Sequence, residues 1–189
     1  MIELYLVRHG ETEENVAQIL QGHLPGHLTA LGRQQASLLA ERLNKEGITF
    51  DALLCSDLQR TLDTATIIRS QLSQNITITP CPLLRERDWG SSTGKAISLA
   101  RSEGIASDAE SVNDMYKRAL RFLSFIKGEY NNQKVLAVGH GLFNRIIQAV
   151  LLGRSKKDIP RMQNAEVRHL TVDQLPDTLY CEEESISAN

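Results

Sequence analysis

Short apolar runs alternate along this chain with longer segments in which apolar residues recur every three or four positions. The short runs at residues 2–7, 51–55, 76–79 and 135–138 are rich in leucine, isoleucine and valine. Short apolar runs without polar alternation are typical of strands that are buried on both faces. The pattern therefore predicts four strands, of which the first is buried and the third, at 76–79, is β-branched and closed by Pro80.

Capping residues mark the helices that are expected between these strands. Thr29 can cap a helix that stops at Gly47, Ser56 with Gln59 forms a capping-box pattern for a second helix, and Ser111 opens a third. A fourth helix follows the last of the four strands. The apolar residues at helical spacing are Ala36, Leu39, Ala40 and Leu43; Leu58, Leu62, Ala65 and Ile68; Val112, Met115, Ala119, Phe122 and Ile126; and Phe143, Ile146, Ile147 and Val150.

Strands that alternate with helices predict an α/β fold, a three-layer α/β/α sandwich around a mostly parallel central sheet. The 189 residues suit one domain, which we expect to span residues 1–181. Residues 166–172 and 178–181 are expected to form a terminal strand pair. The acidic and polar residues 182–189 are expected to form a flexible tail.

Composition excludes several classes of partner. The net charge is −2 and no basic stripe is present, so we expect no nucleic acid partner. No segment has the length and apolarity of a membrane span, so no membrane partner is expected either. Cys55, Cys81 and Cys181 are few and scattered, which argues against a disulfide framework or a zinc knuckle and indicates a cytoplasmic protein.

Charged residues follow each of the four strands. Arg8 and His9 come just after the first, Arg60 after the second, Glu86 after the third and His140 after the fourth. Ligands of α/β sheets bind beyond the carboxyl ends of the strands, where helix N-termini also offer N–H donors to anions. Arginine can hold a phosphate through paired hydrogen bonds, and neutral histidine can attack it.

Taken singly, each of these residues also has an ordinary explanation, such as a solvated arginine or a hydrogen-bonded histidine. A metal site is less favoured than a phosphate site, because no His-x-x-His pair or cysteine ligand accompanies the histidines. His23, His27 and His169 are expected to have no functional role. The combination at one edge of the sheet therefore predicts a phosphate pocket.

Six motifs in order resemble the histidine phosphatase superfamily, in its phosphoglycerate-mutase-like branch. They are Leu6-Val7-Arg8-His9-Gly10-Glu11-Thr12 with Asn15, Gln21-Gly22, Leu28-Thr29-x-x-Gly32-x-x-Gln35-Ala36, Ser56-Asp57-Leu58-x-Arg60-Thr61 with Thr64-Ala65, Leu84-x-Glu86, and Val138-Gly139-His140-Gly141 with Arg145. The resemblance runs from about Ile2 to about Val172. It implies the phosphoglycerate-mutase-like fold.

The resemblance also implies a role for each catalytic position. His9 would be the nucleophile and become a phosphohistidine, while Arg8 and Arg60 would clamp the phosphate. His140, if protonated, would stabilise the transferring phosphoryl group, and Glu86 would be the proton donor. The residues implied on the phosphate or substrate side of the pocket are Asn15, Gln21, Gly22 and Gly141, together with Arg8, Arg60 and His140. No cofactor and no metal is expected, since fixed cations already surround the phosphate.

Three departures from the family pattern lie on the substrate side. Ile19 stands where relatives often carry arginine, His27 stands in a proline-like position, and residues 88–94 differ from the usual aromatic and glycine-rich stretch. Arg85 and Arg87 could receive a second anionic group, although solvent exposure is the more common state for such residues. These departures affect the identity of the substrate more than the chemistry.

The favoured function is a phosphatase that acts on a small phosphorylated metabolite. A mutase must keep water away from the phosphohistidine, and residues 87–110 are expected to form only a modest lid. The alternatives are a cofactor-dependent phosphoglycerate mutase, a phosphatase of phosphorylated proteins, and a non-catalytic phosphate-binding or scaffolding domain. The sequence leaves open whether the chain forms a homodimer.

Overall fold

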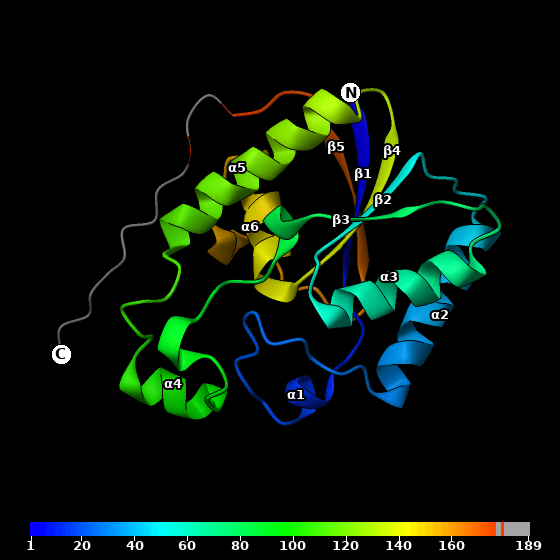
Figure 1. Ribbon diagram of the computed structural model, residues 1–189. Coiled ribbons are helices and arrows are strands. Elements are labelled where there is room, and N and C mark those ends of the chain that lie inside the picture. Colours follow the sequence, from blue (N-terminus) through cyan, green and yellow to red (C-terminus); the bar gives the residue numbers. More distant parts are fainter. Residues whose placement is uncertain (177–178, 180–189) are drawn as a thin grey trace.

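The computed structural model describes residues 1–176 and 179. These residues include a central sheet of five strands. The strands are β1 (Ile2–Arg8), β2 (Ala52–Cys55), β3 (Ile78–Pro80), β4 (Lys134–Gly139) and β5 (Val167–Val172). Their order across the sheet is β3-β2-β4-β1-β5. The first four are parallel, and β5 is antiparallel to β1. The carboxyl ends of the four parallel strands therefore meet at one edge (Figure 1).

Helices cover both faces of this sheet, which confirms the predicted three-layer α/β fold. Helices α2 (Ala30–Lys45) and α3 (Gln59–Gln71) lie on one face, and α5 (Val112–Glu129) and α6 (Gly141–Leu152) lie on the other (Figure 1). The short helices α1 (Glu13–Val16) and α4 (Ile97–Glu103) lie beyond the carboxyl ends of the strands. Single 3-10 turns occupy Pro82–Leu84, Gly90–Ser92 and Lys156–Asp158.

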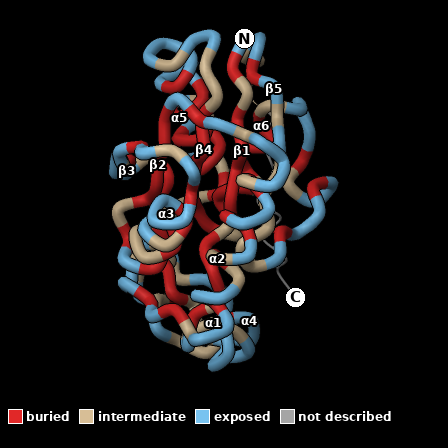
Figure 2. Tube along the Cα trace, turned by 90° about the vertical axis from the view of Figure 1, so that its right-hand side faces the viewer, coloured by how far each residue is buried: buried red, intermediate tan, exposed pale blue. Residues whose placement is uncertain are grey.

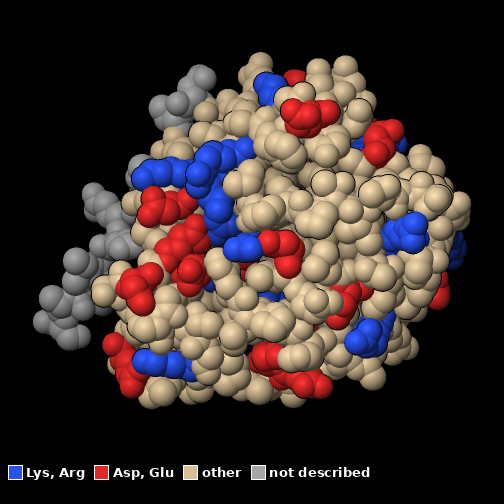
Figure 3. All heavy atoms as spheres, viewed as in Figure 1, with Lys and Arg blue, Asp and Glu red and all other residues tan. Residues whose placement is uncertain are grey.

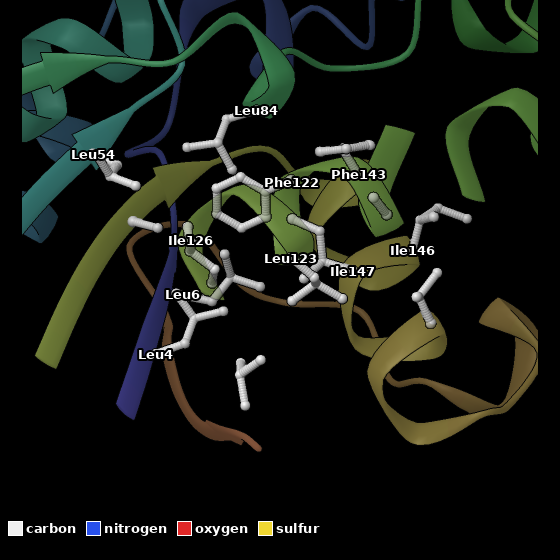
Figure 4. Close-up of a cluster of buried hydrophobic side chains, with 14 of the residues drawn as sticks. Leu4, Leu6, Leu54, Leu84, Phe122, Leu123, Ile126, Phe143, Ile146 and Ile147 are labelled. Atoms are coloured by element: carbon white, nitrogen blue, oxygen red, sulfur yellow. The ribbon is translucent and has the colours of Figure 1, made fainter. Parts of the chain in front are cut away.

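Alternating side chains of each strand feed two separate cores. Leu4 and Leu6 of β1 point toward α5 and α6, where they join Phe122 and Phe143 (Figure 4). Tyr5 and Val7 belong to the core beneath α2 and α3. Strands β1, β2 and β4 are therefore almost continuously buried (Figure 2). Strand β3 at the edge of the sheet has intermediate and exposed residues, and most residues of β5 are also intermediate or exposed.

Two local predictions are wrong in detail. Helix α3 has Leu58 at its N-cap without a side-chain cap, because the Ser56 hydroxyl accepts the Leu58 N–H instead of one inside the helix. The third strand is Ile78–Pro80 rather than 76–79. It is an edge strand, where proline is tolerated because one side of the strand needs no hydrogen-bond donor.

The C-terminal part of the chain also differs from the prediction. Strand β5 confirms the first half of the expected terminal pair, but its partner is β1. Residues 178 and 180–181 of the second half, and all of 182–189, lie outside the described residues. Helices α1 and α4 and the 3-10 turns were not predicted.

Charges of both signs are interspersed over the face shown in Figure 3, where a basic group over α5 has acidic side chains beside it. This mixture agrees with the small net charge of −2. Within residues 1–176, no helix combines the length and apolarity needed to cross a membrane.

Candidate active site

The register of β1 with β4 places the two motif histidines side by side. Arg8 lies opposite Gly139, so His9 and His140 are the next residues on neighbouring parallel strands. The His9 N–H donates to the Gly139 carbonyl at 3.0 Å, and the two imidazole centroids are 5.3 Å apart. Both rings are buried, with exposures of 3% and 0%. Strand pairing alone therefore fixes the central pair of the site.

A cavity of about 370 Å³ opens at this edge of the sheet. Its walls include eight of the nine residues that the sequence assigns to the site, namely Arg8, His9, Asn15, Gln21, Gly22, Arg60, Glu86 and Gly141. His140 is the ninth. It does not line the cavity but is fully buried beside His9 and Arg60.

The hydrogen bond of His9 determines which of its nitrogens is free to react. His9 Nδ1 lies 2.7 Å from the carbonyl oxygen of Gly10, and because a carbonyl can only accept, Nδ1 carries the proton. Nε2 of this tautomer keeps its lone pair. Burial, followed by the charges of Arg60 and Arg8, holds the pKa of His9 well below its ordinary value. His9 is therefore a neutral imidazole, as a nucleophile requires.

His140 has the opposite arrangement of ring nitrogens. The Arg60 Nε–H donates to His140 Nδ1 at 3.2 Å, so Nδ1 is the acceptor and Nε2 carries the proton. Burial, with the nearby charge of Arg60, lowers the pKa of His140 well below its ordinary value. His140 in this state is a neutral donor rather than the protonated residue considered from the sequence. Its buried Nε2 has no partner in the described part of the chain.

Arg60 holds the neighbouring loop as well as His140. Its Nη1 donates to the carbonyls of Leu24 and Pro25, and its Nη2 donates to the carbonyl of Gly22 at 2.8 Å. Gly22 has a φ of +48°, a left-handed conformation that favours glycine and turns its carbonyl toward Arg60. Burial lowers the pKa of Arg60 to about 10. Arg60 therefore shapes the cavity wall in addition to supplying charge.

Arg8 is less engaged than Arg60. Its Nη1 donates to the Met162 carbonyl at 2.7 Å, while its buried Nε has no partner within the described residues. A Cβ on Gly141 would lie 3.2 Å from that Nε, so the absence of a side chain at Gly141 leaves room for the guanidinium. Arg8 thus has free donors at the cavity floor, as a phosphate clamp requires.

A capping box positions Asn15. Thr12 caps α1, its side chain accepts the Asn15 N–H, and Asn15 Oδ1 accepts the Thr12 N–H at 3.2 Å. Asn15 Oδ1 also accepts from Asn164 Nδ2, which donates in addition to the His9 carbonyl. With its carbonyl oxygen used twice, Asn15 presents its amide N–H groups as donors at the cavity wall. Sequence reasoning missed Asn164, which lies in a segment without periodic pattern.

Glu86 is held by the N-terminus of α6. Its carboxylate accepts N–H bonds from Leu142 and Phe143 at 3.1 Å and from Arg87 at 2.9 Å. The Nε2 of His23 donates to the Glu86 carbonyl at 3.0 Å. His23 therefore supports this loop, a contact that its predicted lack of function did not anticipate. His27 bonds to Glu14, and His169 stacks on Tyr5, both away from the cavity.

Residues 87–110 cover the outer part of the cavity. They contribute Trp89, Ile97, Ala100, Arg101 and Ile105 to its walls. Backbone hydrogen bonds link this segment to residues 18–20, including Leu20 N–H to the Lys95 carbonyl at 2.9 Å. Of the three departures from the family pattern, Ile19 and Trp89 of residues 88–94 lie in this wall, whereas His27 does not line the cavity.

Two arginines outside the motifs extend the positive charge at the mouth of the cavity. Arg101 and Arg161 line it, are exposed, and form no ion pair within the described residues. Arg85 and Arg87 do not line it. Arg85 forms a two-point ion pair with Asp57, and Arg87 stacks on Trp89. In residues 1–176 and 179, no group of three or more His, Cys, Asp or Glu side chains is arranged to hold a metal ion.

Comparison with known proteins places this geometry in a family. The sequence pattern that defines the histidine phosphatase superfamily (branch 1) matches residues 4–176. A probable phosphoglycerate mutase of Proteus mirabilis is 34% identical over 167 residues, which cover 81% of this chain and 76% of that protein. A broad-specificity phosphatase of Saccharomyces cerevisiae is 30% identical over 145 residues, covering 76% of this chain and 63% of the relative.

A solved structure agrees with these relatives. A mycobacterial glucosyl-3-phosphoglycerate phosphatase superposes with a TM-score of 0.79 at 25% identity, covering 89% of this chain and 92% of the other. Family pattern, relatives and fold therefore indicate the same superfamily. The chain belongs to the histidine phosphatase superfamily, branch 1.

Proposed function

We propose that this chain is a phosphatase that hydrolyses small phosphomonoesters through a phosphohistidine on His9. The observation that carries the proposal is the tautomer of His9, whose Nδ1–H bond to Gly10 leaves the Nε2 lone pair at a cavity floor shared with Arg8. A neutral imidazole beside guanidinium donors suits attack on an anionic phosphorus centre.

The proposed reaction has two steps. In the first, His9 Nε2 attacks phosphorus, the bond from phosphorus to the ester oxygen breaks, and Glu86 gives a proton to the leaving oxygen. In the second, Glu86 takes a proton from water, the water oxygen attacks phosphorus, and the bond to His9 breaks. Arg8, Arg60 and the Nε2–H of His140 stabilise the charge on the transferred group, so the proposed reaction uses no metal ion.

The apolar outer wall of the cavity favours a substrate whose alcohol part has an apolar surface. Trp89, Ile97, Ala100 and Ile105 face the space beyond the phosphate-binding residues. A volume of about 370 Å³ suits a small phosphorylated metabolite better than a folded phosphoprotein. The exposed arginines at the mouth would attract the anionic substrate.

Hydrolysis is favoured over a mutase reaction because water can reach the site. Ile105 in the outer wall is 41% exposed, and Arg101 and Arg161 are exposed as well. Supplying 3-phosphoglycerate with a bisphosphoglycerate primer distinguishes the two activities. We expect release of inorganic phosphate to outpace isomerisation, and the reverse order would support the mutase.

The covalent intermediate is the direct test. Quenching the enzyme in alkali during turnover of a ³²P-labelled phosphomonoester should leave acid-labile label on the peptide that contains His9. His9→Ala should lose the label and lower kcat by about 10³-fold or more. Replacement of the exposed His27 is the matched control and should change neither. Turnover by His9→Ala near the wild-type rate would refute the proposal.

A further inference from the structure

Arg118 of α5 lies outside the cavity, but it contacts both structures that hold Glu86. The residue is 9% exposed and is absent from the cavity walls. Burial of a guanidinium is costly unless every N–H finds an acceptor. A buried Arg118 is therefore expected to have an acceptor for each of its N–H groups.

All five N–H groups of Arg118 have acceptors. Nη1 donates to the carbonyls of Leu83 at 2.9 Å and Arg85 at 2.6 Å, and Nη2 donates to the carbonyl of Glu86 at 3.5 Å. The remaining two donate to the two carboxylate oxygens of Glu110 at 2.8 and 2.7 Å. Three of the acceptors are thus backbone carbonyls of residues 83–86, the segment that carries Glu86.

The same guanidinium packs on the other support of Glu86. Its central carbon lies 3.8 Å from the centroid of the Phe143 ring. The backbone N–H of Phe143 is one of the donors to the Glu86 carboxylate. One cation therefore sets the distance between the Glu86 loop and the N-terminus of α6.

Glu110 connects this arrangement to the segment that covers the cavity. Its N–H donates to the Asp88 carbonyl at 2.8 Å, and its carbonyl accepts from Arg87 Nε at 2.8 Å. The two ends of segment 87–110 are thus joined beside Arg118. The ion pair between Arg118 and Glu110 anchors both ends to α5.

We propose that Arg118 is a positioning residue for the proton transfer by Glu86, and that its pair with Glu110 couples this position to the cover formed by residues 87–110. The proposal rests on the proposed function, in which Glu86 protonates the leaving oxygen. A bidentate, fully used guanidinium has a geometry that lysine cannot reproduce. Loss of that geometry displaces the Glu86 carboxylate relative to His9 while the rest of the phosphate site stays in place.

The test compares two leaving groups in Arg118→Lys, in Glu86→Gln and in the double variant. An alkyl phosphate needs a proton on its leaving oxygen, whereas p-nitrophenyl phosphate scarcely does. Arg118→Lys should lower kcat/KM for the alkyl phosphate by about 10- to 100-fold and for p-nitrophenyl phosphate by less than about 3-fold. Glu86→Gln should also lower kcat/KM more for the alkyl phosphate than for p-nitrophenyl phosphate, and the difference between the two losses should be larger than in Arg118→Lys. The double variant should be no slower than Glu86→Gln alone, because both changes remove the same step.

Arg69→Lys is the matched control. Arg69 is also a helix arginine that binds a neighbouring loop, through Ile76 and Asn75, but at the far end of α3. It should leave both substrates unaffected. Glu110→Gln offers a second variant if Arg118→Lys does not fold. It should also lower kcat/KM more for the alkyl phosphate than for p-nitrophenyl phosphate, with a smaller difference between the two losses.

Each outcome has a definite meaning. Equal losses for both substrates in Arg118→Lys and Glu110→Gln, or additive losses in the double variant, would overturn the positioning role while leaving the proposed function intact. A Glu86→Gln variant without any split would overturn the acid role of Glu86, and the positioning role with it.

Discussion

At the scale of single residues, hydrogen bonds give the two histidines different chemistry. His9 donates from Nδ1 to a carbonyl, and His140 accepts at Nδ1 from Arg60. Two residues that look equivalent in the sequence therefore present a lone pair and an N–H respectively. Their division of roles follows from the neighbours that the fold provides.

The proposed role of His140 predicts a specific defect. His140→Asn should lower kcat/KM by about 10²- to 10³-fold, because one donor to the transferring phosphoryl group is lost. The loss should be similar for p-nitrophenyl phosphate and an alkyl phosphate, since His140 acts on the phosphoryl group and not on the leaving oxygen. A pronounced dependence on the leaving group would instead place His140 in proton transfer.

Sequence reasoning identified the residues that the motifs contain but not the residues that support them. His9, Arg8, Arg60 and Glu86 are named by motif, and the structure brings them to one cavity. Asn164 is different, because it bonds to the His9 carbonyl across 155 positions of sequence. No local pattern reports a contact at that separation.

At the scale of elements, the backbone after β1 packs directly on the start of α2. A Cβ added at Gly32 would overlap the backbone oxygen and nitrogen of Glu11, and one at Gly10 would overlap the Gly32 carbonyl. The glycine at position 32 is therefore required for close approach of two backbones. This contact holds the segment that follows His9.

Replacement of Gly32 tests this contact. Gly32→Ala should lower the free energy of unfolding by about 1–3 kcal/mol, because the overlapping atoms belong to backbone that cannot move aside cheaply. Gly128→Ala in α5 is the matched control. A Cβ there meets nothing within 4 Å, and the change should stabilise the helix by about 0.5–1 kcal/mol. Denaturant titration of both variants measures the difference, and a neutral Gly32→Ala would contradict the packing argument.

The elements that the sequence predicted are those with a one-sided apolar stripe. Helices α2, α5 and α6 bury one face against the sheet, so their spacing is visible in the sequence. Helix α4 has seven residues and one buried residue, Ala100. Ile97 and Ala100 face a cavity and not a core, and Leu99 is exposed, which leaves no periodic signal. The cover was therefore expected as a segment, but its helix was not.

Helix α4 gives a prediction about substrate size. Ala100 is 2% exposed and lines the cavity, so Ala100→Phe should occupy space for the alcohol part. We expect kcat/KM for 1-naphthyl phosphate to fall by about 10-fold or more, and that for ethyl phosphate by less than about 3-fold. Leu99→Phe is the control, because Leu99 is 45% exposed on the same helix and does not line the cavity. Equal effects on the two substrates would contradict the proposed position of the alcohol part.

At the scale of the whole molecule, strand order creates the site. Strand β4 comes late in the sequence but lies between β2 and β1 in the sheet. This position places His140 beside His9 and within hydrogen-bond distance of Arg60 of α3. Apolar runs predict strands but not their order, since every buried parallel strand has a similar composition. The residues that follow each strand predicted that the histidines would lie at one edge of the sheet, and the strand order places them side by side.

Burial of two neutral histidines makes the stability of the molecule depend on pH. The pKa values of His9 and His140 are lowered in the fold, so below about pH 6.5 the unfolded chain binds protons that the native state does not. The free energy of unfolding should therefore fall as the pH decreases from about 7 to about 5, by up to about 1.4 kcal/mol per pH unit for each histidine. Denaturant titrations across this range should show a shallower slope in a variant with both histidines replaced by asparagine.

His27 supplies the control for this slope. The carboxylate of Glu14 raises the pKa of His27, so its contribution to stability is present at acid pH and is lost as the pH rises through its folded value. Replacing His27 should therefore leave the fall in the free energy of unfolding at acid pH unchanged or make it steeper. Arg85 lowers the pKa of Asp57, so this carboxylate loses its contribution to stability only at more acid pH, outside this window. An unchanged slope in the variant without His9 and His140 would show that neither histidine is buried in its neutral form.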